Sequence, residues 1–274
     1  MVKNLYIDGI DVRDAFGVWV RKGGYDDLFT FPPMKPPYFN DWPEQHGIEV
    51  DLKAPTLAPL SVQVLLIASG ANANVAGFIE LLSKPGYRAC RFPTLDREFK
   101  LRYVECGDFE QVGNVSVFAV QFELDEPKRV DPATWLAPGV PVRPSAYELD
   151  GTNFADFGLF VRMGKGSLLC PAPAKQNLTR DISVLDGRIY DAGKTYRNAK
   201  EITLQCALKA ASMSRLWSCR DAFFNRLIAT GEHTITYAGA EYPVFYNETT
   251  GGQLLALREN LVMCGFELKL TVIR

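Results

Sequence analysis

The sequence predicts a mainly β protein, a β-sandwich or split barrel with one α-helix per domain, present as an internal tandem duplication. Several segments alternate apolar and polar residues with the period of two that is typical of half-buried strands. Each half also carries one segment with the spacing of an amphipathic helix. The third observation is a repeated pattern: Asp8-Gly9 and Phe16-Gly17 reappear as Asp150-Gly151 and Phe157-Gly158. An internal repeat of this length indicates two copies of one structural unit.

The correspondence extends along nearly the whole chain of 274 residues. Its offset is 142 at Asp8, 141 at Phe16, 140 at Asp41, 145 at Phe78 and 146 at Phe118. Five prolines within residues 127–144 separate the halves, and such a segment is typical of a semi-rigid linker. The sequence therefore predicts a first domain at 1–127, a linker at 128–144 and a second domain at 145–274.

Each copy is expected to begin with a hairpin and a short strand. Leu5, Ile7 and Ile10 flank Asp8-Gly9, and an Asp-Gly pair between apolar residues is a strong signal for a tight turn. The residues from Phe16 to Val20 are mostly aromatic or β-branched, which favours a strand.

The middle of each copy combines a strand, a helix and a closing strand. Residues 62–66 and 202–206 alternate as strands, and so do 118–124 and 264–270. The apolar spacing of residues 75–82 predicts a helix that Asn72 or Asn74 could cap. The same reasoning predicts a second helix over 216–227, with Ser212 or Ser214 at its start.

A proline-rich stretch interrupts the first copy after its opening strand. Four prolines among Pro32, Pro33, Met34, Lys35, Pro36 and Pro37 exclude a central strand or a helix, because each proline removes a backbone donor. Cys170-Pro171-Ala172-Pro173 is a plainer version at the equivalent place in the second copy. We expect an extended projecting loop or a sheet edge, which in a multi-subunit assembly would be the candidate for an arm that reaches a neighbouring subunit or layer.

The bulk composition excludes several classes of protein. A hydrophobic content of 47% predicts a packed core, and a net charge of −2 argues against binding of nucleic acid through a basic field. No apolar run approaches the roughly 20 residues of a membrane span, and no N-terminal signal is visible. The six scattered cysteines favour reduced thiols and a protein made in a cytoplasm.

Candidate catalytic groups are few. His46 and His233 are the two histidines, and no metal-ligand spacing surrounds either of them. The adjacent carboxylates Asp26-Asp27 and Asp125-Glu126 fall in predicted loops, where solvated surface charge is their ordinary role. The sequence predicts no catalytic, metal or cofactor site, and hence a protein that is not an enzyme.

The order of elements resembles a known family. The predicted order is similar to that of the phage tail tube-like domain of distal tail and baseplate hub proteins. It begins with a hairpin on Ile7-Asp8-Gly9 and continues with Ala15-Phe16-Gly17-Val18, a projecting loop, paired strands, one helix and closing strands. Leu149-Asp150-Gly151 and Asp156-Phe157-Gly158-Leu159 carry the same pattern again. Distal tail proteins usually contain one such domain and form hexamers. Two-domain hubs form trimers with pseudo-sixfold symmetry, but they carry further domains that this chain lacks.

The resemblance implies a structural role in a phage or prophage tail. It implies a trimeric or hexameric ring assembled in the bacterial host cytoplasm, contacts with tail tube, tape measure and tail fibre or tip proteins, and a lumen through which DNA could pass. Residues 1–132 carry 14 basic and 19 acidic residues, whereas residues 133–274 carry 16 and 13. The two halves therefore have net charges of −5 and +3. In a ring in which the two kinds of domain alternate, each domain would lie beside domains of opposite charge. The alternative is a non-catalytic module that binds a carbohydrate or a receptor at a tail tip.

Overall fold

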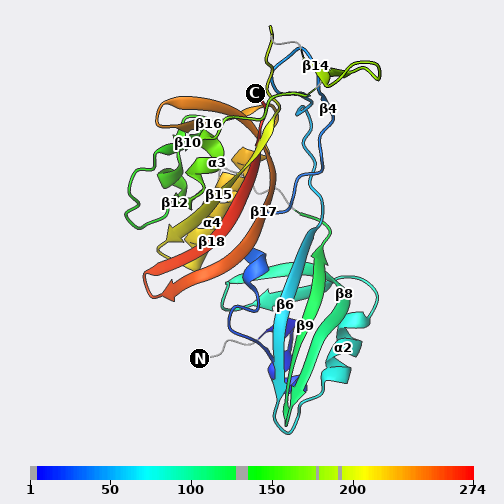
Figure 1. Cartoon of the computed structure of the whole chain (residues 1–274). Helices are drawn as coiled ribbons and strands as arrows, with labels where there is room; N and C mark the ends of the chain where they lie inside the picture. Colours follow the sequence, from blue (N-terminus) through cyan, green and yellow to red (C-terminus); the bar gives the residue numbers. More distant parts are fainter. Residues whose placement is uncertain (1–4, 128–134, 177–178, 191–192) are drawn as a thin grey trace.

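The computed structural model describes residues 5–127, 135–176, 179–190 and 193–274, and it contains two large antiparallel sheets, one in each half of the chain (Figure 1). The first sheet has the strand order β2-β1-β7-β8-β9-β6-β3. Its strands are β1 (Tyr6–Ile7), β2 (Ile10–Asp11), β3 (Val18–Val20), β6 (Leu60–Ser69), β7 (Arg88–Phe92), β8 (Arg97–Val112) and β9 (Val115–Leu124). The accompanying helices are α1 (Val12–Phe16), the 3-10 helix η1 (Asp26–Phe29) and α2 (Val75–Ser83).

The second sheet has the order β11-β10-β16-β17-β18-β15-β12, which matches the first sheet position by position. Its strands are β10 (Tyr147–Leu149), β11 (Thr152–Asn153), β12 (Leu159–Met163), β15 (Lys200–Ala210), β16 (His233–Tyr237), β17 (Ala240–Arg258) and β18 (Leu261–Val272). The helices are the 3-10 helix η3 (Phe154–Phe157), α3 (Lys165–Leu169) and α4 (Met213–Leu227). The predicted mainly β fold is confirmed, with one large antiparallel sheet in each half of the chain.

The long strands in the centre of each sheet follow the predicted alternation. Every second residue of β6 faces the core, so that Val62, Val64 and Leu66 are fully buried. Strand β6 pairs with β9 over its whole length, and β15 pairs with β18 in the same way. Both long helices lie where the apolar spacing predicted them, with Asn74 and Ser212 as their N-caps.

The predicted strand from Phe16 to Val20 is wrong in its first half. Phe16 ends helix α1, which Asp11 caps, and Gly17 terminates this helix with a positive φ of 62°. Gly158 ends η3 in the same conformation, with φ 73°. Glycine adopts the left-handed region without the penalty of a Cβ atom, so the Phe-Gly pair is a helix end followed by a strand. In addition to the one long helix that was predicted, the first domain has the short helices α1 and η1, and the second has η3 and α3.

The repeated Asp-Gly pair is a tight turn whose aspartate holds a neighbouring strand. Asp8 and Asp150 both have positive φ, 51° and 48°. The Asp8 carboxylate accepts from the backbone N–H of Ala89 at 2.9 Å, and the Asp150 carboxylate accepts from the backbone N–H of Thr234 at 2.8 Å. Aspartate tolerates this conformation because its short side chain bonds locally, and here the bond fixes the first strand to its neighbour.

The partner cation of this aspartate differs between the copies. Arg88 donates to Asp8 at 2.9 Å, whereas the buried His233 contacts Asp150 through Nδ1 at 2.8 Å and the Ala229 carbonyl through Nε2 at 3.1 Å. Burial opposes a charge on His233, but the bonds to these two acceptors and the attraction of Asp150 raise its pKa above the ordinary value. A protonated imidazolium donates to both acceptors.

We expect the contribution of His233 to the stability of the protein to be lost as the pH rises above about 6.5. Because the pKa of His233 is raised in the folded state, its contribution is fully present below about pH 6.5 and is lost as the pH rises through the folded pKa. Urea unfolding between pH 6 and pH 8.5 measures this loss, and His233→Gln should flatten the profile. An unchanged slope in His233→Gln would contradict the assignment.

Part of the predicted linker at 128–144 packs on the second domain, while residues 128–134 lie outside the described part of the chain. Trp135 stacks on Phe157 with ring centroids 4.7 Å apart, and the Leu136 N–H donates to Ser218 Oγ at 2.7 Å. The division at 127 and 145 stays a prediction. No helix among the described residues is long and apolar enough to cross a membrane.

Candidate functional site

Each domain sends out an extended arm between its third strand and its first long strand. The first arm, residues 31–58, is closed by a bridge between Met34 and Leu57 and carries the hairpin β4 (Phe39–Asn40) and β5 (Glu49–Val50). The second arm, residues 171–198, is closed by the bridge Ala174–Arg197 and carries β13 (Thr179–Asp181) and β14 (Arg188–Tyr190). Both bridges correspond at an offset of 140. The first arm runs along the second domain to the same end of the molecule as the second arm (Figure 1).

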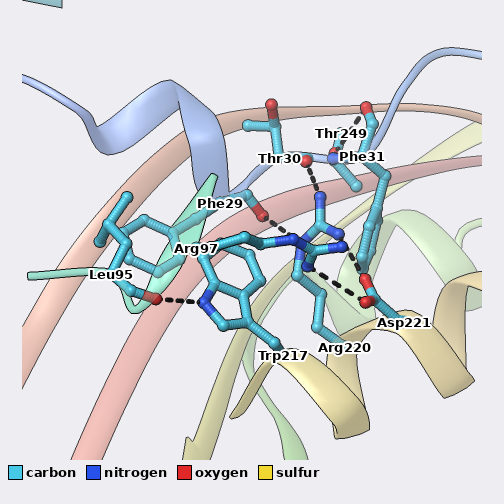
Figure 2. A network of polar contacts seen from close by, with 9 residues as sticks. All are labelled: Phe29, Thr30, Phe31, Leu95, Arg97, Trp217, Arg220, Asp221 and Thr249. Atoms are coloured by element: carbon cyan, nitrogen blue, oxygen red, sulfur yellow. Dashed lines mark hydrogen bonds and ion pairs between the residues drawn. The ribbon is translucent and has the colours of Figure 1, made fainter. Parts of the chain in front are cut away.

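The start of the first arm is clamped by a buried arginine of the second domain. Arg220, on α4, is only 7% exposed and donates to the Phe29 carbonyl at 3.3 Å and to the Thr30 carbonyl (Figure 2). It also donates to Asp221 at 2.9 Å. Burial lowers the pKa of Arg220, and the neighbouring Asp221 opposes that effect. A guanidinium with several fixed donors can hold two consecutive carbonyls and a carboxylate together.

Aromatic stacking surrounds this polar network. Phe29 stacks on Trp217 with centroids 5.3 Å apart, and Phe31 stacks on Phe224 at 4.8 Å. The Arg220 guanidinium lies over the ring of Phe31 at 4.6 Å. Phe29 and Phe31 are fully buried. These contacts make the interface between the domains resemble a continuous core.

The connection between β7 and β8 of the first domain reaches the same helix. The Trp217 indole N–H donates to the Leu95 carbonyl at 2.6 Å, and Arg97 pairs with Asp221 at 3.1 Å (Figure 2). Asp221 thus lies between two arginines, Arg97 and Arg220. The clamp joins two separate segments of the first domain to α4, and this arrangement restricts rotation between the domains.

The two arms bind each other beyond the clamp. Lys175 of the second arm is 4% exposed and donates to Asp41, to the Trp42 carbonyl at 2.7 Å and to the Gly47 carbonyl at 2.8 Å. Gly47 has φ 68°, and a Cβ atom at this position would overlap the carbonyl of Ile273. The close approach of the first arm to the residues that follow β18 therefore requires glycine.

The predicted arm residues Pro32, Pro33, Met34, Lys35, Pro36 and Pro37 lie along the second domain of their own chain. The hydroxyl of Tyr246 donates to the Pro32 carbonyl at 3.1 Å, and the Met34 N–H donates to the Asn247 carbonyl at 2.8 Å. Lys35 and Pro36 are exposed. Contact of this arm with a neighbouring subunit stays a prediction.

The paired carboxylates singled out in the sequence hold structure together. Asp26 accepts from the Leu254 N–H at 3.2 Å, and Asp27 accepts from the Gln63 N–H at 3.0 Å. Arg102 donates to Asp125 at 2.7 Å and thereby lowers the pKa of that carboxyl, and Lys100 pairs with Glu126. Within the described ranges, no group of three or more histidine, cysteine or acidic residues could hold a metal ion.

Sequence reasoning missed Arg220 as a functional residue. The predicted apolar face of α4 was Leu216, Cys219, Phe223 and Leu227, which packs on the second sheet. Trp217, Arg220 and Phe224 form a second stripe, spaced by three and four residues, directly beside that face. Together, the two stripes cover more of the helix circumference than a helix that packs on one sheet needs. This width indicates that α4 is buried on one side by the second sheet and on another by the first domain.

Comparisons with known proteins give matches among solved structures. No protein family and no curated protein matches the chain. A crystal structure described as SPP1 Dit (gp 19.1), a paradigm of the hub adsorption apparatus in phages that infect Gram-positive bacteria, aligns over 99% of this chain and 98% of its own. The sequence identity is 11% and the TM-score is 0.36.

Proposed function

We propose that the protein is a non-enzymatic structural component of a phage or prophage tail, in which three chains form a ring or hub at the distal tail or baseplate. Two domains per chain would place six related domains around one lumen, giving pseudo-sixfold symmetry. The tail tube, tape measure and tail fibre or tip proteins would be its partners.

One observation carries the proposal: two seven-stranded sheets share one strand order and are held in a fixed relation by a buried clamp. In a rotationally symmetric assembly, each unit has the same geometric relation to the next one. A fixed relation between a domain and its copy can therefore recur around a ring. The resemblance of the Asp-Gly and Phe-Gly patterns to tail tube-like domains supports the same role.

The longest hairpins supply candidate surfaces for contact with other tail layers. Strands β8–β9 and β17–β18 expose apolar side chains near their turns, and Phe109, 53% exposed in the first pair, corresponds at an offset of 146 to Leu255, 37% exposed in the second. Exposed apolar residues at corresponding places in both domains favour a shared partner surface over random exposure.

Light scattering on the purified chain, with negative-stain images, tests the proposal. We expect a particle with three times the mass of one chain, or a multiple of that mass, and annular projections. A species that remains a monomer at the highest attainable concentration would contradict the ring.

A second candidate function rests on the tip of the first arm, where Tyr38 is 90% exposed, Phe39 60% and Trp42 47%. Grouped exposed aromatics are typical of surfaces that stack on a carbohydrate or anchor a receptor. The monomer outcome of the same experiment would favour this binding module.

A further inference from the structure

The segment that docks the first arm has a counterpart in the second domain. The first docking segment is residues 26–34 and the second docking segment is residues 166–174, at the constant offset of 140. Both begin after a glycine packed against a strand: a Cβ atom on Gly24 would overlap the Leu65 carbonyl, and one on Gly164 would overlap the Thr203 carbonyl. Both segments lead from a short helix into an arm that is closed by one bridge.

The two docking segments differ sharply in burial. Phe29 and Phe31 of the first segment are fully buried against α4. Their counterparts are Leu169 and Pro171, and Leu169 is 52% exposed. Cys170, the counterpart of the clamped Thr30, is exposed as well. Lys200 of the same domain donates to the carbonyls of Ser167 (2.9 Å), Leu168 (2.6 Å) and Cys170, so the backbone of the second segment is held within its own domain. The exposed side chains of Leu169 and Cys170 are the part of this segment that can meet a partner.

The corresponding receiving surface is on helix α2 of the first domain. Phe78 contacts Phe16 edge-on at 6.0 Å as Phe223 contacts Phe157 at 5.4 Å, which fixes the offset between α2 and α4 at 145. At that offset, Arg220 and Phe224 correspond to Val75 and Ile79.

This surface is accessible and apolar. Val75 and Ile79 are half-buried, and the neighbouring strand β8 exposes Val104 at 41% and Phe109 at 53%. Figure 1 shows α2 on the side of the first sheet that faces away from the second domain. The second docking segment of the same chain consequently does not cover it.

The charges of the two surfaces are complementary. Beyond Tyr103, the charged residues of β8 are Glu105, Asp108 and Glu110, and Glu80 is the one charged residue of α2. Exposed charged residues beside the second docking segment include Arg162, Lys165 and Arg197, of which Arg197 donates to the Ala172 carbonyl at 2.9 Å. Opposite charges favour association of these two surfaces and disfavour pairing of either with itself.

We propose that the second docking segment of one copy of this chain binds the α2–β8 surface of the first domain of the next copy. The inference rests on the proposed ring, for which it names the contact between chains. The contact is head-to-tail, so each chain offers one docking segment and one receiving surface, and such contacts generate a ring when the rotation closes. The buried contact inside each chain would then alternate with its counterpart between chains.

An engineered disulfide tests the contact, because the native Cys170 occupies the position equivalent to Thr30. Val75→Cys places a thiol at the position equivalent to Arg220, which binds Thr30 within the chain. On mild oxidation we expect disulfide-linked dimers and trimers on a non-reducing gel, and mass spectrometry should identify the peptide pair that contains positions 75 and 170. Val75→Cys combined with Cys170→Ser should abolish the ladder. Lys84→Cys, exposed just beyond the other end of α2, should cross-link far more slowly.

Leu169→Glu is an independent variant that does not depend on a change in α2. Since Leu169 is half exposed, the fold should tolerate the change, while assembly should weaken at least about tenfold because a carboxylate would be buried without a partner. Assembly into rings with neither cross-link nor weakening would overturn this contact and leave the ring standing. Dimers linked only through two copies of position 75 would overturn the head-to-tail arrangement. A monomer that never cross-links would contradict the ring and the contact together.

Discussion

Replacing Arg220 with alanine is expected to destabilise the protein by about 3 kcal/mol and to uncouple its two domains. The change leaves the carbonyls of Phe29 and Thr30 buried without a donor. Asp221 keeps Arg97 as a partner at 3.1 Å, so the loss should lie at the lower end of the range for a broken buried pair. Urea unfolding followed by circular dichroism should show one transition in the parent protein and two in the variant.

Two further substitutions separate the role of the charge from that of volume. Arg220→Met keeps most of the volume, so it should lose less stability than Arg220→Ala while still splitting the transition, because neither variant satisfies the two carbonyls. Arg226→Ala is the matched control on the same helix: Arg226 is 43% exposed, and its loss should change stability by less than about 1 kcal/mol. An unchanged single transition in Arg220→Ala would show that the clamp does not couple the domains.

The fold was predictable because its signals are local and occur twice. Alternation located the long strands, apolar spacing located both long helices, and the matching strand orders agree with the nearly constant offsets in the sequence. The Phe-Gly pair was assigned to a strand because aromatic and β-branched residues follow it. The stronger signal was Asp11, which caps the short helix, together with the glycine that ends it.

The clamp was much harder to predict. Because Arg220 is charged, a search for an apolar helix face does not include it. Its partners are backbone carbonyls about 190 residues away, and backbone groups cannot be recognised from the residue types in the sequence. The proline-rich stretch did predict an extended arm. Sequence alone could not place that arm against the second domain, because the contacts that hold it are made by Phe31 and by backbone groups.

Replacing Phe31 with alanine should release the first arm from the second domain. The ring is fully buried, stacks on Phe224 at 4.8 Å and meets Phe266 edge-on at 5.1 Å, so its removal should cost about 3–5 kcal/mol. The cavity would open beside the Phe31 N–H, which donates to Thr249 Oγ1 at 2.6 Å, and the backbone bonds of the arm should become labile. Hydrogen exchange over residues 31–58 measures this release directly.

The control for Phe31 is another phenylalanine on the same arm. Phe39 is 60% exposed, and Phe39→Ala should change stability by less than about 0.5 kcal/mol and leave the exchange pattern as it is. Faster exchange in both variants would mean that the arm is held by its hairpin and not by the stacked ring. Faster exchange in Phe31→Ala alone, with the sheets still protected, would place the docking energy at the start of the arm, because the rest of the arm makes its contacts mainly through backbone groups and Lys175.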